Sequence, residues 1–96
     1  MSELADRLLT RTKLRPDAAE RLAARLERHP DLKRETERWL DDQEFDLTLQ
    51  ADGRSFGQLL AQFSDMASAL AIAMDLREDP IGTRAFLARG WDRIQG

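Results

Sequence analysis

The stretch that decides the fold is Phe56–Leu76, with the sequence FGQLLAQFSDMASALAIAMDL. Its apolar residues recur every three or four positions, the spacing that places side chains on one face of an α-helix. A second face carries Ala69, Ile72 and Leu76. A helix that is apolar around most of its circumference is the centre of a bundle or is shared between subunits. The sequence therefore predicts a long central helix over residues 56–78, capped by Ser55 and ended by Pro80.

Three shorter helices are predicted before this segment and one after it. Leucines and alanines at helical spacing predict helices over about residues 2–13, 17–28, 30–42 and 81–94. Prolines at the starts of the second and third helices fit the first helical turn. The last helix is expected to bury Phe86, Leu87, Trp91 and Ile94. The prediction is a mainly all-α fold, a single domain over residues 1–96 with five helices arranged as a bundle around the central one.

The segment between the third helix and the central helix has a different pattern. Phe45, Leu47 and Leu49 alternate with polar residues, which is the periodicity of a strand, and Asp52-Gly53 indicates a turn. No second alternating segment occurs elsewhere in the chain. We therefore expect residues 45–50 to be an extended connector. A two-stranded ribbon formed with the same segment of another subunit is the alternative.

Composition limits the classes of function. The 96 residues include 15 Lys and Arg against 18 Asp and Glu, which gives a formal net charge of −3, and no cysteine. The acidic balance does not favour phosphate binding, and the missing cysteines exclude disulfides and thiolate sites. No signal peptide is apparent, and Asp65 within the longest apolar stretch opposes a membrane span. We expect a cytoplasmic protein without membrane contact, of bacterial type by its size and acidity.

Catalytic and metal-binding signatures are weak. His29, the one histidine, precedes Pro30 between two predicted helices and has no companion motif, so we interpret it as a turn or capping residue. Asp42, Glu44 and Asp46 alternate like the first ligands of a calcium loop, but the glycine and the closing glutamate of that loop are missing. The sequence predicts no enzyme, no cofactor and no metal site.

A nucleic-acid interface is an alternative prediction. The second and third helices could form a helix-turn-helix over about residues 17–42, in which Arg21, Arg25 and Arg28 make a basic stripe. Against it, the third helix opens with Pro30-Asp31 and contains two glutamates that would approach phosphates. Nucleic-acid binding by a dimeric transcriptional regulator is therefore the less favoured hypothesis.

The favoured hypothesis is a non-catalytic protein that binds another protein through an apolar helix surface. Such a protein would be a regulator of the inhibitor, antitoxin, immunity or adaptor type; a small accessory subunit of a larger complex is a further alternative. The simplest partner is a second copy, because two-fold dimers are the commonest assemblies. The residues predicted to form the interface are Phe63, Met66, Leu70, Ile72, Met74 and Trp91. Whether Ile72, on the second face, contacts a partner or the core of its own chain distinguishes an interface from an ordinary core.

Overall fold

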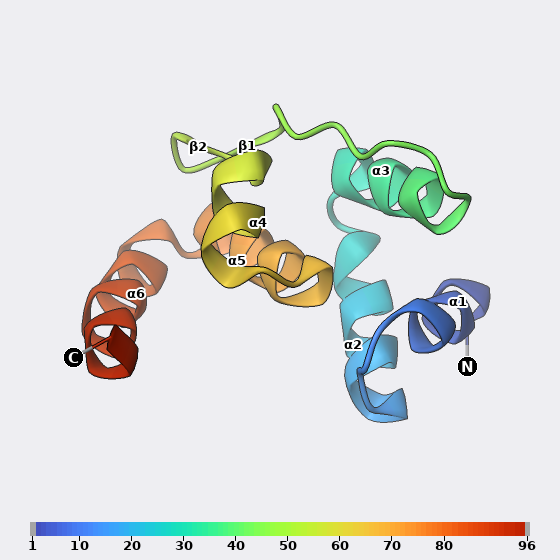
Figure 1. Ribbon diagram of the computed structural model, residues 1–96, viewed down its shortest axis with the longest axis horizontal. Helices are drawn as coiled ribbons and strands as arrows, with labels where there is room; N and C mark the ends of the chain where they lie inside the picture. Colours follow the sequence, from blue (N-terminus) through green and yellow to red (C-terminus); the bar gives the residue numbers. More distant parts are fainter. Residues whose placement is uncertain (1, 96) are drawn as a thin grey trace.

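The structure is a computed structural model that describes residues 2–95, and the side chains of residues 2–89. Helices dominate the described residues (Figure 1), which confirms the mainly all-α prediction. The elements are α1 (Glu3–Arg11), α2 (Pro16–Leu26), α3 (Pro30–Leu40), β1 (Gln50–Ala51), β2 (Arg54–Ser55), α4 (Phe56–Phe63), α5 (Met66–Glu78) and α6 (Pro80–Gln95).

The predicted long central helix is wrong, because it is interrupted at Ser64 and Asp65. Ser64 has a left-handed backbone with φ 56° and ψ 17°, which ends α4, and its N–H donates to the Leu60 carbonyl at 2.7 Å. Asp65 then caps α5: its carboxylate accepts from the backbone N–H of Ser68 at 3.2 Å and from the Ser68 hydroxyl at 2.6 Å. Two short helices that pack against each other therefore replace one long helix.

The helix α5 lies at the centre of the fold, where α4, α2, α6 and β1 all contact it (Figure 1). Its inward face is fully or nearly fully buried and consists of Ala67, Ala69, Leu70, Ala73, Met74 and Leu76. Burial of a side chain as large as leucine or methionine contributes about 1.5–3 kcal/mol. The bundle is therefore organised around α5 alone rather than around the whole of residues 56–78.

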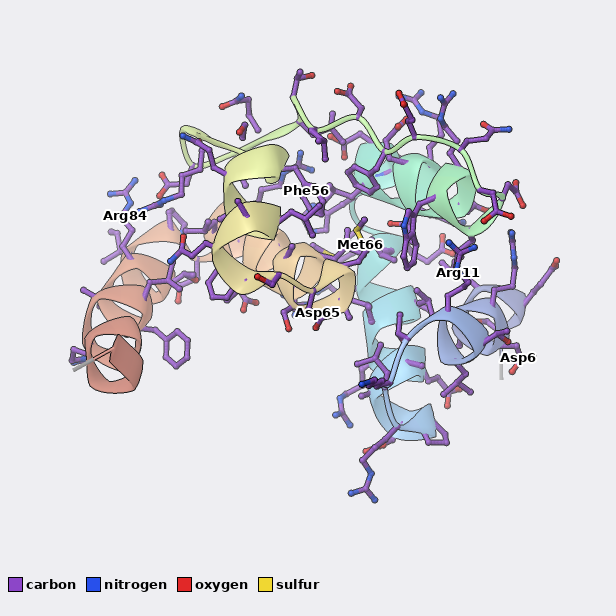
Figure 2. All side chains as sticks on the ribbon, in the orientation of Figure 1. Asp6, Arg11, Phe56, Asp65, Met66 and Arg84 are labelled. Carbon is purple, nitrogen blue, oxygen red and sulfur yellow. The ribbon has the colours of Figure 1, made fainter. Side chains whose placement is uncertain are left out.

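The segment before α4 is an irregular connector that ends in a short hairpin. Phe45 is buried and stacks on Phe56 of α4, with ring centroids 4.3 Å apart, whereas Leu47 is exposed. Phe56 is labelled in Figure 2. β1 pairs antiparallel with β2 around Asp52-Gly53, where both residues have positive φ as a tight hairpin turn requires. The strand that pairs with β1 is thus β2 of the same chain. Its two residues are too few to show an alternating pattern in the sequence. The structure agrees with the connector over residues 45–49.

The last helix, α6, packs on α5 through a narrow strip of side chains. Thr83 and Leu87, four residues apart, are buried toward α5, whereas Ile81 is 79% exposed and Phe86 is 60% exposed. The prediction that Phe86 is buried is therefore wrong, because one helical step of about 100° separates it from Leu87. Arg84 binds Asp52 in the hairpin turn (Figure 2) and fixes the start of α6.

The backbone at Ser64 gives a test of the helix break. Glycine adopts the left-handed region without strain, so Ser64→Gly should raise the free energy of unfolding by about 0.5–1 kcal/mol. Ser64→Ala should change it little, because alanine has a Cβ like serine and meets the same strain in this region. A continuous helix predicts the opposite order, since alanine favours and glycine disfavours a helix interior. Urea denaturation of both variants distinguishes the two structures.

Candidate interaction surface

Arginine–carboxylate pairs join helices that are distant in the sequence. Arg7 and Arg11 of α1 bind Asp41 and Asp42 at the end of α3, and Arg11 also lies over the ring of Trp39 at 4.8 Å. The partners that join α2 and α3 to α5 are Arg25 with Asp75, Arg28 with Glu78 at 2.9 Å, and Arg77 with Asp31 at 2.8 Å. These arginines therefore hold the fold together, which leaves them less available to an external anion.

The predicted basic stripe of α2 is divided by these contacts. Arg25 and Arg28 face carboxylates of α5, so their charges are compensated within the chain. Arg21 is largely exposed and pairs with Asp17 at 3.2 Å, one helical turn earlier. No basic stripe with free charge remains on α2, and the structure gives the helix-turn-helix hypothesis no electrostatic support.

The histidine is part of the same contact between α2 and α5. His29 is buried at the turn between α2 and α3, and its Nε2 lies 2.8 Å from Oε2 of Glu78. The hydrogen bond to His29 and the neighbouring Arg28 lower the pKa of Glu78 below its ordinary value. Arg25 also lies 3.7 Å from the Glu78 carboxylate. Glu78 thus contacts Arg25, Arg28 and His29, which belong to α2 and the turn that follows it. This arrangement is a structural junction between helices.

The predicted interface residues fall into two groups. Leu70 and Met74 are fully buried, so in this fold they belong to the core and are unavailable to a partner. Phe63, Met66 and Ile72 are only partly buried and pack at the margin of the core. The side chain of Trp91 lies outside the described side chains. The possible interface on α5 is therefore smaller than predicted, and Ile72 remains within it.

One face of α5 remains open, and most of it is uncharged. Ser68, Ala71, Ile72 and Asp75 follow the spacing i, i+3, i+4, i+7, which places them on one side of the helix. All four are partly exposed, and only Asp75 carries a charge. Charged residues make up 34% of the chain, so an uncharged exposed surface of this kind is a distinct local feature. Depletion of charge is typical of the centre of protein–protein interfaces.

Beside this open face lies a groove between α5 and α2, here called the alanine groove. It has a volume of about 350 Å³ and is lined by Leu14, Ala18, Leu22, Ala67, Ser68 and Ala71, with Arg21 and Arg25 at its margin. Small side chains on both helices leave the groove open. The way in which α2 faces α5 is a tertiary relation that the apolar spacing of one helix does not show, so the sequence carries no direct signal for this groove.

A second cleft of about 520 Å³ continues from the groove around the first turn of α5. Leu14 and Ala67 line both cavities, and Arg11, Lys13 and Met66 belong to the second cleft. Lys13 makes no ion pair with any described residue, and Asp65 lines the same cleft. The arginines at the margin of the groove, Arg21 and Arg25, are paired with Asp17 and Asp75.

Comparison of the chain with protein-family models, curated proteins and solved structures finds no match. Among the described residues, no group of three or more histidine and acidic side chains could hold a metal ion. No helix of the described chain is long and apolar enough to cross a bilayer.

The pair between Arg77 and Asp31 gives a prediction about stability and pH. Hydrogen bonds from Arg77 lower the pKa of Asp31 from 3.8 to about 2. A lowered pKa stabilises the fold above pH 4, and this contribution is lost as the pH falls from about 4 to 2. Because both side chains are partly exposed, Asp31→Asn should cost about 1–2 kcal/mol at pH 7, and about nothing near pH 2.

Chemical denaturation at both pH values measures this difference. Asp17→Asn is the matched control, because Asp17 pairs with Arg21 in an exposed position and its loss should change stability by less than about 0.5 kcal/mol. Equal costs for the two variants at pH 7 would show that the α3–α5 pair is not a structural contact.

Proposed function

We propose that this chain is a non-catalytic protein that acts by binding another protein through the open face of α5 and the adjacent alanine groove. The observation that carries the proposal is the groove itself, an apolar cavity that adjoins the uncharged residues Ala71 and Ile72. Apolar side chains of a partner helix or loop fit such grooves, and burial of their surface supplies the free energy of binding. The role is that of a regulator, inhibitor or adaptor.

Contacts within the chain also favour a protein partner over a nucleic acid. Binding to duplex DNA depends on cations that can displace counterions from phosphates. Arg25 and Arg28 already neutralise Asp75 and Glu78, and the chain as a whole has a formal charge of −3. The open face of α5 offers methyl and hydroxyl groups in place of cations. The dimeric DNA-binding regulator therefore has less support than the protein-binding role.

An affinity experiment with groove variants tests the proposal. The immobilised chain is incubated with an extract of the source cells, and the retained proteins are compared between wild type and Ala71→Glu. A carboxylate in the groove must be desolvated when a partner binds, so Ala71→Glu should reduce retention of at least one protein by about tenfold or more. The retained protein, once purified, should bind wild type in calorimetry and bind the variant about tenfold more weakly or worse.

The matched control is Ala24→Glu, which places the same charge on an exposed site of α2 that does not line the groove. It should retain the same proteins as wild type. Equal retention by wild type and Ala71→Glu, or no specific retention by wild type, contradicts the proposed function. Salt-sensitive binding of random duplex DNA at low ionic strength would instead favour the nucleic-acid alternative.

A further inference from the structure

We propose that the partner for the alanine groove is a second copy of this chain, and that Phe86 of each copy enters the groove of the other. This inference rests on the proposed function, because it names the occupant of the same surface. It follows from an exposed aromatic side chain, an open apolar groove, their position along one face of α5, and the charges around each.

Phe86 is the exposed aromatic side chain. It is 60% exposed, and it lines a cavity of about 440 Å³ between the end of α5 and α6, together with Asp75, Glu78, Asp79, Gly82 and Thr83. A phenylalanine ring in water is an unfavourable arrangement that burial at an interface relieves. Aromatic residues that enter a desolvated pocket are typical anchors of interfaces. Phe86 therefore has the properties of an anchor that the described side chains of its own chain leave largely exposed.

The alanine groove has the properties of the receiving site. Its walls are apolar at Leu14, Leu22 and the alanines of α2 and α5, and its volume of about 350 Å³ is at the lower end of the range for pockets that enclose a ligand group. No described side chain of the same copy occupies it. A ring that enters this groove would contact methyl groups on two helices.

The groove and Phe86 lie in sequence along the same face of α5. Arg25 lines the groove, Asp75 lines the cavity beside Phe86, and these two residues are bound to each other, so their ion pair is the boundary between the two sites. Figure 1 shows α2 and α6 extending to the same side of α5, one toward each end of the molecule. The groove, at Ser68 and Ala71, and the cavity beside Phe86, at Asp75 and Glu78, therefore follow one another along α5.

A two-fold axis near the Arg25–Asp75 pair brings the two sites together. It places the α5 helices of the two copies antiparallel, with the groove of each copy opposite Phe86 of the other, and Ile72 close to the axis. Because both contacts form in the same dimer, the assembly is closed and does not extend into a fibre.

The charges around the two sites are complementary. Three carboxylates line the cavity beside Phe86, and Asp79 makes no ion pair with any described residue. Asp75 and Glu78 are already paired with Arg25 and Arg28, so the free charge beside Phe86 is that of Asp79. On the side of the groove, Arg21 is paired with Asp17, and the charge without an ion pair to a described residue in the adjoining cleft is that of Lys13, with Asp65 in the same lining. In the dimer Asp79 of one copy therefore meets the side that carries Lys13 of the other. These opposite charges favour this pairing over a parallel one, which would place like charges together.

Light scattering on the purified chain tests the dimer. At a chain concentration of about 100 μM, the expected solution mass is twice the 11.0 kDa of one chain. Phe86→Ala should weaken self-association by about 100-fold, because each dimer loses two anchors worth about tenfold each. Ile81→Ala is the matched control on the same helix, since Ile81 is even more exposed but does not line the cavity, and it should leave the mass unchanged.

A second pair of variants tests the groove. Ala71→Leu fills the groove with a side chain of its own copy and should give a folded monomer, whereas Ala24→Leu, outside the groove, should remain dimeric. Circular dichroism confirms that each variant is folded. Equimolar mixing of Phe86→Ala with Ala71→Leu should restore part of the dimer, because one intact contact forms between the Phe86 of one chain and the open groove of the other.

The outcomes separate this inference from the proposed function. A monomeric wild type, or a dimer that survives both Phe86→Ala and Ala71→Leu, overturns the inference. The proposed function stands in that case if Ala71→Glu still loses a protein that wild type retains. Restored association on mixing supports the inference, and no restoration on mixing two folded monomeric variants contradicts the reciprocal contact.

Discussion

The left-handed backbone at Ser64 is the constraint on which the rest of the structure depends. It ends α4 within a segment whose apolar pattern continues, and it lets Asp65 start α5 in a new direction. Because α4 packs on α5 instead of extending it, one α-helical hairpin covers part of the apolar surface that a single helix would leave exposed. The hairpin in turn gives β1, α2 and α6 a common surface on α5.

The sides of α5 then have different roles. Its inward face supplies core residues such as Leu70 and Met74, and its last turns bind α2 and α3 through Asp75, Arg77 and Glu78. Arginines that could have formed a basic surface are used in these contacts. The remaining face, around Ala71, is uncharged and adjoins the alanine groove. The proposed interaction surface therefore lies on the part of α5 that precedes its ion pairs with other helices.

The sequence predicts the helical class and most helix boundaries, because proline positions and apolar spacing are local signals. It does not predict the break at Ser64, since the apolar pattern continues across it and the N-capping Asp65 resembles a lone polar residue in a helix. The apolar type of Phe86 predicts a core position, whereas its place one residue before the buried Leu87 turns its side chain toward another side of α6. The alanine groove depends on how α2 faces α5, a tertiary relation that no single helix encodes.

Cross-linking in this cysteine-free chain tests the central claim, that the open face of α5 receives Phe86 of a second copy. An Ala71→Cys chain is mixed with a Phe86→Cys chain under mild oxidation, so that the second contact of the mixed dimer keeps its native residues. If Phe86 enters the groove of a second copy, a disulfide-linked heterodimer should form much faster than one between Ala24→Cys and Phe86→Cys chains. Equal rates for the two mixtures, or no linked product, would contradict it.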